Sequence, residues 1–308
     1  APSLWNAFFA DVADHVPQGN QQINLFADDL TVMTHAPQHV SEDLIFDELT
    51  EVQTRTHAWG RRNQVEFDPS KEHFNIIHPS QGSGDDFKLL GTVIDCALTM
   101  LPCIEGILGK IRPKIRALLR LRHMYSTAAL LGQYKCHIWG LKEYSNGAII
   151  LAAPCQLKRL DKVQRWYLHE LGLTDTEAFV SYNFAPPSLR RCIGVLGLLH
   201  KRVLGKCHPG LCIALPFAEG LDADYHSRAL HPRSDLVNRH ARLYQRSLFA
   251  YILIYNRLPQ ALVDMPSVKS FQAKLAHLAR HRAENNQEDW RRSYQDCSEV
   301  NVMFYPGN

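Results

Sequence analysis

Hydrophobic and polar positions in the first hundred residues follow both helical and extended periods. Apolar side chains recur about every four positions across residues 2–16, which predicts a helix. A second helix is predicted from Ser41, a favourable N-cap, to a stop at Gly60. Extended segments are predicted at residues 65–67 and 74–77. This mixture of periods predicts an α+β fold.

Two short hairpins are predicted in the same region. Residues 24–32 consist of an apolar segment, the adjacent carboxylates Asp28 and Asp29, and a second segment with β-branched residues. This order is typical of two strands joined by a tight acidic turn. Residues 87–95 predict a second strand pair with a Leu-Gly dipeptide at its bend. Both hairpins need helices behind them, because an isolated two-stranded sheet is marginally stable.

Beyond residue 100 the pattern is that of helices. Pro113 should kink or restart the first of these helices, and Gly140 and Gly147 should interrupt the second. The helix near residue 250 is predicted to be buried, and the last one to be basic and amphipathic. The segments with helical character are 104–118, 128–150, 154–171, 186–202, 244–255 and 268–282.

Composition fits a folded protein whose charge is divided along the chain. The 308 residues are 45% hydrophobic and 21% charged, and the longest apolar run is far too short to span a bilayer, so we expect no membrane partner. The first 100 residues hold 15 Asp and Glu against 5 Lys and Arg, whereas the rest hold 16 against 29. The acidic part suits metal chemistry and the basic part suits a polyanion, although the two parts could simply attract one another.

Two of the predicted helices carry clusters of cations. The first cluster spans residues 110–122 without an acid among them, and the second spans residues 158–165. Such clusters can neutralise phosphates, and each contact adds to the salt dependence of binding. A solvated helix face would also be charged, but the missing counter-charges favour nucleic acid. The candidate nucleic-acid-binding residues are Lys110, Arg112, Lys114, Arg116, Arg120, Arg122, Lys158, Arg159, Lys162 and Arg165.

The acidic turn is a candidate metal site. Neighbouring carboxylates such as Asp28 and Asp29 repel each other in water and are stabilised by a divalent cation. Their hard oxygen ligands suit Mg²⁺ or Mn²⁺, and two-metal sites use such carboxylates in phosphoryl transfer. The alternative is a surface turn with two solvated aspartates.

The cysteines indicate a reducing environment. The chain has eight cysteines, none in a CxxC pair, which favours free thiols in an intracellular, reducing compartment over a disulfide framework. The nucleus and an organelle such as the mitochondrion are not distinguished. Cys207 and Cys212 could donate to zinc, but a second ligand pair at a suitable spacing is missing. No secretory signal and no initiator Met are present, so we expect a processed product or a piece of a longer protein.

Residues 26–29 resemble an [FY]-x-D-D box, and residues 59–63 with 70–72 resemble a W…N…K-[TS]-E segment. The order of these motifs resembles the C-terminal half of the palm of a reverse transcriptase, with the closest similarity to non-LTR, LINE-type retrotransposons. Residues 87–94 resemble the primer-grip hairpin, and residues 2–9 resemble the helix after the PQGS loop. Downstream, the L-x-x-L-D-x-V-Q-R string that begins at Leu157 looks like the region after the thumb.

The resemblance implies roles for individual residues. Asp28 would be the main metal ligand of its box, with Asp29 as its neighbour. Lys71 would protonate or neutralise the leaving pyrophosphate, unless it is an exposed turn lysine. Leu90 and Gly91 would seat the primer end. The fingers and the first catalytic aspartate of the family would lie outside this chain.

The resemblance also implies an organisation in three parts. Residues 1–100 would form a partial palm of antiparallel hairpins packed on helices, residues 101–175 a basic, helical, thumb-like region, and residues 176–308 a C-terminal helical region. A palm without its other wall exposes an unpaired strand edge, which other protein chains would cover.

Two functions follow from the resemblance. In the first, the chain is a reverse-transcriptase-derived fragment that acts as a non-catalytic RNA-binding or structural subunit of a large assembly such as a ribonucleoprotein. In the second, it is part of an active RNA-directed DNA polymerase, a nucleotidyltransferase that uses Mg²⁺ and binds RNA or an RNA/DNA duplex. Whether the chain is an enzyme stays undecided. The family it resembles is one of RNA-directed DNA polymerases, but the chain alone should be inactive in either case.

Overall fold

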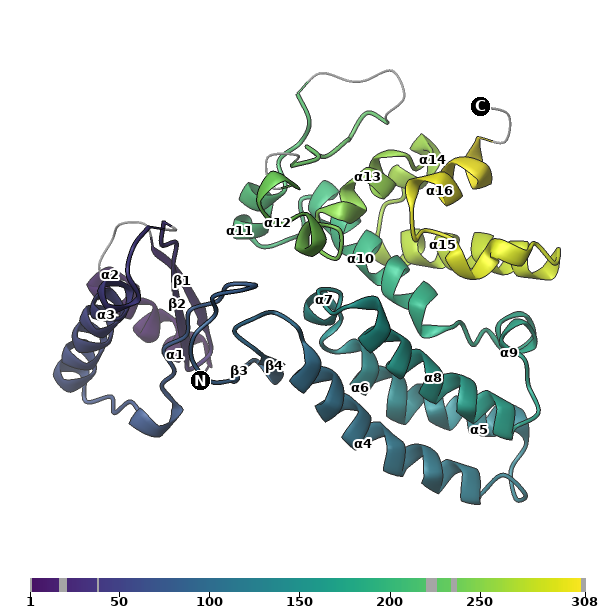
Figure 1. Cartoon of the computed structure of the whole chain (residues 1–308), viewed down its shortest axis with the longest axis horizontal. Helices are drawn as coiled ribbons and strands as arrows, with labels where there is room; N and C mark the ends of the chain where they lie inside the picture. Colours follow the sequence, from purple (N-terminus) through teal and green to yellow (C-terminus); the bar gives the residue numbers. More distant parts are fainter. Residues whose placement is uncertain (1, 17–20, 38, 220–225, 234–236, 306–308) are drawn as a thin grey trace. The chain divides into compact units, whose positions relative to one another are not determined.

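The computed structural model divides the chain into two compact units, residues 1–76 and 77–308. Each unit combines helices with a two-stranded antiparallel sheet, so the predicted α+β composition is confirmed (Figure 1). Among the described helices, none pairs the length of a membrane span with the apolar composition that such a span needs. The residues that the structure describes are 2–16, 21–37, 39–219, 226–233 and 237–305.

The first unit contains the acidic hairpin and the helices behind it. The predicted first helix is divided at Asp11, and the hairpin forms as predicted, with Phe26 of one strand paired to Asp29 of the other. The elements are α1 (Pro2–Ala10), α2 (Val12–His15), β1 (Gln21–Phe26), β2 (Asp29–Thr34), α3 (Glu42–Asn63) and the 3₁₀ turn η1 (Pro69–Lys71).

A small aromatic core joins the hairpin to the helices. Phe9, Val12 and Trp59 are buried, and Leu25 and Leu30 from the two strands pack against them. The indole Nε1 of Trp59 donates to the carboxylate of Asp11 at 2.8 Å. The hairpin is therefore held on a helical layer.

Two predictions for the first unit are wrong. Helix α3 continues past Gly60 to Asn63, because Gly60 is there for a close approach: a Cβ at this position would lie 2.6 Å from the backbone carbonyl oxygen of Val65. Residues 65–67 and 74–77 form no strand of two or more residues. Val65 and Phe67 pack against the aromatic core instead of pairing with a strand.

The second unit begins with the shorter hairpin and is otherwise helical. The hairpin predicted at residues 87–95 is confirmed, as is the basic helix predicted at 268–282. The described elements are β3 (Phe87–Leu89), β4 (Thr92–Ile94), α4 (Leu101–Arg120), α5 (Thr127–Tyr134), the π-helical turn η2 (Lys135–Trp139), α6 (Gly140–Glu143), α7 (Asn146–Ile149), α8 (Pro154–Glu170), α9 (Asp175–Tyr182), α10 (Pro187–Val203), α11 (Pro209–Ala214), α12 (Val237–Tyr244), α13 (Ala250–Asn256), α14 (Gln260–Val263), α15 (Val268–Glu284), the 3₁₀ turn η4 (Glu288–Arg292) and α16 (Cys297–Phe304).

Two hydrophobic cores hold these helices together. One is formed mainly by α4, α5 and α8, and includes the fully buried Ile104, Ile111 and Tyr167. The other surrounds α10, α13 and α15. Helix α10 packs against α8 as well as α15, so it connects the two cores (Figure 1). The positions of α4 and α8 are therefore fixed from the interior of the unit.

The helix boundaries of the second unit differ from the sequence prediction at three places. Helix α4 does not restart at the exposed Pro113, because Ile111 and Ile115 on either side are buried in the core. The helical run that starts at Thr127 also continues across Gly140 and ends near Tyr144. Residues 244–255 are not one helix, since α12 ends and α13 begins within them.

Candidate nucleic-acid interface

The acidic turn of the first unit is joined to α1 by a hydrogen bond and is open to solvent. Ala27 and Asp28 form its two-residue loop, and Ala27 has a φ of 55°, in the left-handed region that Ala rarely adopts. Trp5 of α1 donates from its indole Nε1 to the carbonyl oxygen of Ala27 at 3.1 Å. Asp28 and Asp29 are both exposed. Their carboxylates are thus available at the tip of the hairpin.

Among the described residues, the acidic turn gathers only the two carboxylates of Asp28 and Asp29 as possible metal ligands. Across the described residues, no three His, Cys, Asp or Glu side chains converge on a point that could hold a metal ion. Asp28 and Asp29 could give a cation oxygen ligands from one side only. Further ligands would have to come from water, from a bound phosphate or from another strand.

Lys71 is not brought to the acidic turn by any contact of the described residues. It lies on η1 with its side chain 82% exposed, and its Nζ is 3.6 Å from the Asp68 carboxylate. The neighbouring Glu72 fixes this segment, because its carboxylate accepts hydrogen bonds from Gln53 and His57 of α3. The sequence had suggested no role for Glu72.

The predicted primer-grip residues lie in the second unit, on the turn between β3 and β4. Leu90 and Gly91 have φ values of 46° and 83°, the positive values that a two-residue hairpin turn requires. The Tyr144 hydroxyl donates to the Leu90 carbonyl at 2.6 Å, and the hydroxyls of Thr92 and Ser145 are 2.9 Å apart. The hairpin is thereby fixed to the junction of α6 and α7.

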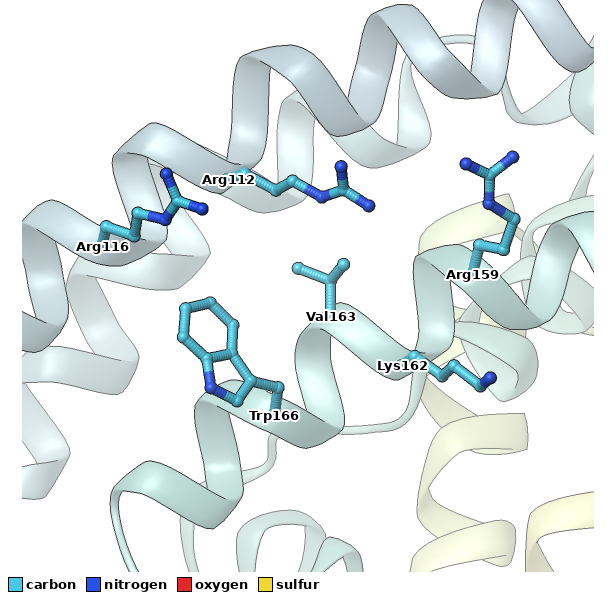
Figure 2. A pocket seen from close by; sticks show the side chains of 6 residues that line it. All are labelled: Arg112, Arg116, Arg159, Lys162, Val163 and Trp166. Atoms are coloured by element: carbon cyan, nitrogen blue, oxygen red, sulfur yellow. The ribbon is translucent and has the colours of Figure 1, made fainter.

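A basic groove runs between α4 and α8, and both predicted cation clusters contribute to it. Its two adjoining hollows are open to solvent and have volumes of about 490 and 420 Å³. Figure 2 shows the first hollow, with Arg112 and Arg116 on α4 facing Val163 and Trp166 on α8. The residues that line the two hollows, named together as the basic groove, are Arg112, Arg116, Leu119, Arg120, Arg122, His123, Arg159, Lys162, Val163 and Trp166.

Ion pairs fix the two ends of the basic groove. Arg159 contacts Glu105 at 2.6 Å near the start of both helices, and Arg122 contacts Glu170 at 2.6 Å near their ends. The cations between these pairs are exposed, and no carboxylate of a described residue lies within ion-pair distance of them. These uncompensated cations are Arg112, Arg116, Arg120 and Lys162.

The structure brings together six of the ten predicted cations and leaves four outside the groove lining. The four are exposed on the same helices, and they are Lys110, Lys114, Lys158 and Arg165. Trp166 lies among the arginines of the groove but is not one of the binding residues predicted from the sequence. The sequence feature that could have identified it is its position on the basic side of an amphipathic helix, four residues after Lys162.

Helix α8 is held from behind by buried polar contacts. Asp161 receives two hydrogen bonds from the Arg191 guanidinium, at 2.8 and 3.0 Å. Gln164 donates to the Ala185 carbonyl at 3.0 Å and accepts from the buried Lys142 at 3.1 Å. Because these partners lie on the interior side, the outward residues of α8 keep a fixed orientation toward the groove.

The cysteines form no second site. All eight lie in the described part of the chain, and no disulfide joins any of them. The Sγ atoms of Cys207 and Cys212 are 3.2 Å apart, but no third metal-ligating side chain among the described residues joins them. This pair therefore lacks the ligand number of a structural zinc site.

Comparison with known proteins gives no relative: no family model, no curated protein and no solved structure matches the chain.

Proposed function

We propose that this chain is an RNA-binding protein, derived from a reverse transcriptase of the non-LTR type, that acts as a non-catalytic subunit of a larger assembly. The observation that carries the proposal is the basic groove, in which four cations lack a carboxylate partner among the described residues. The motifs at residues 26–29 and 87–94 support the ancestry.

The spacing of the groove arginines supports contact with a phosphate backbone. Arg112, Arg116 and Arg120 are one helical turn apart on α4, which separates them by about 6 Å along the helix axis. Guanidinium groups bind phosphate oxygens through two parallel hydrogen bonds. A row of such groups can therefore follow successive phosphates of one strand.

The charge balance of the second unit supports the same proposal. Residues 77–308 contain 30 Lys and Arg against 19 Asp and Glu, whereas residues 1–76 contain 4 against 12. Self-repulsion of cations opposes folding, and the negative charges of a polyanionic partner reduce that repulsion. The counterions that the polyanion releases on binding add to the affinity. Binding should therefore be strong at low salt and weaken steeply as salt rises.

A charge-matched pair of variants tests the proposal. The groove variant combines Arg112→Ala, Arg116→Ala and Arg120→Ala, and the control variant combines Lys110→Ala, Lys114→Ala and Arg165→Ala. The affinity for a fluorescein-labelled single-stranded RNA is measured by anisotropy at several salt concentrations.

We expect the groove variant to lose about 10- to 1,000-fold in affinity and to lower the salt slope by about two, since each lost phosphate contact removes about 0.7 from the slope. The control should change affinity much less. Equal losses in both variants would mean general charge attraction, and no loss in either would refute the proposal.

The polymerase alternative is favoured by a specific feature of the acidic turn. Ala27 adopts the positive φ that a two-residue hairpin turn requires, and Trp5 donates a hydrogen bond to its carbonyl oxygen. The turn presents the adjacent carboxylates of Asp28 and Asp29 at the exposed tip of the hairpin, where they could bind a divalent cation. A two-metal centre also needs ligands from another strand, which the alternative places, with the fingers and the first aspartate, on a missing N-terminal portion of the protein.

Primer extension tests this alternative. The chain is combined with a polypeptide that supplies the missing strand of the sheet, and Mg²⁺-dependent extension of a primer on RNA is measured. Asp28→Ala should abolish extension, whereas the exposed Asp43→Ala on α3 should not. Extension that persists with Asp28→Ala would exclude the metal role of the acidic turn.

A further inference from the structure

We infer that the basic groove is specific for single-stranded nucleic acid, with an unstacked base packed against Trp166. The inference rests on the proposed RNA binding and adds the class of ligand. The evidence for it is the environment of the Trp166 side chain and not the charge of the surface.

Trp166 differs from the other four tryptophans of the chain. Trp5 and Trp59 donate hydrogen bonds and contact aromatic rings, and Trp139 and Trp290 stack on phenylalanines. Trp166 has no hydrogen bond and no ring contact with any described residue, and it is 39% exposed. An indole with open surface inside a cationic groove offers a stacking platform.

The two hollows of the groove meet at Trp166. Among the described residues, only Arg116 and Trp166 line both of them. Both hollows are open to solvent, so a base could reach the indole from either hollow, with its phosphate on the arginines of α4.

A duplex cannot use this platform. Its bases are stacked on one another, and only their edges reach the grooves, so an indole meets a base face only in an unpaired strand.

The guanidinium groups strengthen the same preference. Arginine planes stack on exposed bases as well as binding phosphates. In Figure 2 the side chains of Arg112 and Arg116 face Trp166 and Val163 across the hollow. A base could thus lie between a guanidinium and the indole.

The test compares a 12-nucleotide single-stranded oligoadenylate RNA with a 12-base-pair RNA duplex, both labelled with fluorescein. The variants of the full chain are Trp166→Ala and Trp166→Phe, with Tyr305→Ala as a control because Tyr305 is a similarly exposed aromatic residue outside the groove. Thermal unfolding of each variant is followed by circular dichroism, and a change in midpoint assigns the loss to folding and overturns the inference.

We expect Trp166→Ala to weaken binding of the single strand about 5- to 100-fold without changing the salt slope, because it removes stacking but no cation. Trp166→Phe should recover most of the affinity, and the duplex should be unaffected by both. Tyr305→Ala should leave single-strand binding unchanged. Addition of the single strand should quench tryptophan fluorescence in the wild-type chain but much less in Trp166→Phe.

Other results would overturn the inference in distinguishable ways. If Trp166→Ala leaves single-strand binding unchanged while the triple-arginine variant weakens it, the groove binds RNA by charge alone. If Trp166→Ala weakens binding of heparin, a polyanion without bases, by the same factor, the groove recognises anions rather than bases. If neither variant weakens binding, the proposed function itself fails.

Discussion

Replacement of Lys142 by Met should stabilise the second unit. The Lys142 Nζ is buried, donates to Gln164 Oε1 at 3.1 Å and lies 3.4 Å from the Tyr134 hydroxyl. Burial lowers the pKa of Lys142 from 10.5 to about 7, although the nearby Asp161 carboxylate acts in the opposite direction. At pH 7 the unfolded chain therefore holds this amine fully charged, whereas the folded chain holds it about half neutral.

The size of the effect follows from this difference in pKa. One pKa unit corresponds to about 1.4 kcal/mol, so burial of the Lys142 amine opposes folding by roughly 4 kcal/mol at pH 7. Met removes that penalty but leaves the buried Gln164 oxygen without its donor, which costs about 1–3 kcal/mol. We expect Lys142→Met to raise the free energy of unfolding by about 1–3 kcal/mol at pH 7.

The pH dependence of unfolding tests the direction of the Lys142→Met effect a second time. Because the folded-state pKa is the lower one, the penalty in the wild-type chain shrinks as pH rises from about 7 toward 10.5, where the unfolded chain also loses its proton. The stability gained by Lys142→Met should therefore be smaller at pH 9.5 than at pH 7.

Urea unfolding, followed by far-ultraviolet circular dichroism at both pH values, measures this gain. Lys110→Met, at an exposed position of α4, is the control and should change stability by less than about 0.5 kcal/mol. A loss of stability in Lys142→Met at pH 7, or a gain of equal size at both pH values, would refute the reasoning.

Three further predictions concern the packing of both units. Gly60→Ala should lower the unfolding free energy of the first unit by about 1–3 kcal/mol in urea unfolding, because the new Cβ would lie 2.6 Å from the Val65 carbonyl oxygen. Gly106→Ala on α4 is the control: its Cβ meets open space, so it should raise the unfolding free energy of the second unit by up to about 1 kcal/mol. His200 is buried and its pKa is lowered, mainly by that burial, so the unfolding free energy should fall as pH drops below about 6.5, and His200→Asn should reduce the difference between pH 7 and pH 5.5. Tyr144→Phe removes the hydrogen bond to the β3–β4 turn and should speed amide hydrogen exchange in that hairpin, while unchanged exchange would show that other contacts hold it.

The sequence predicted the elements whose signals are local. The buried face of α4, with Ile104 and Ile111, follows from helical spacing alone, and the hairpins follow from short apolar segments around Asp28 and Gly91. The positions of the cations on two exposed helix faces could be predicted for the same reason. These patterns depend only on neighbours within a few turns of the chain.

The groove could not be predicted, because it depends on which helices pack together. No local pattern places α4 beside α8. Nor does one show that Arg122 and Arg159 form ion pairs while no carboxylate in the described part of the chain pairs with Arg116. Gly60 was mistaken for a helix stop because the close approach of Val65 is a tertiary contact. The relation of the acidic turn to a polymerase stays a prediction.

The central claim is that RNA occupies the basic groove, and ultraviolet crosslinking tests it most directly. The chain is irradiated with a bound single-stranded RNA, digested, and the crosslinked peptides are identified by mass spectrometry. We predict adducts on peptides that contain Trp166 or residues 112–123, and a strong reduction in the triple-arginine variant. Adducts confined to other parts of the chain, at a yield equal in both proteins, would contradict the claim.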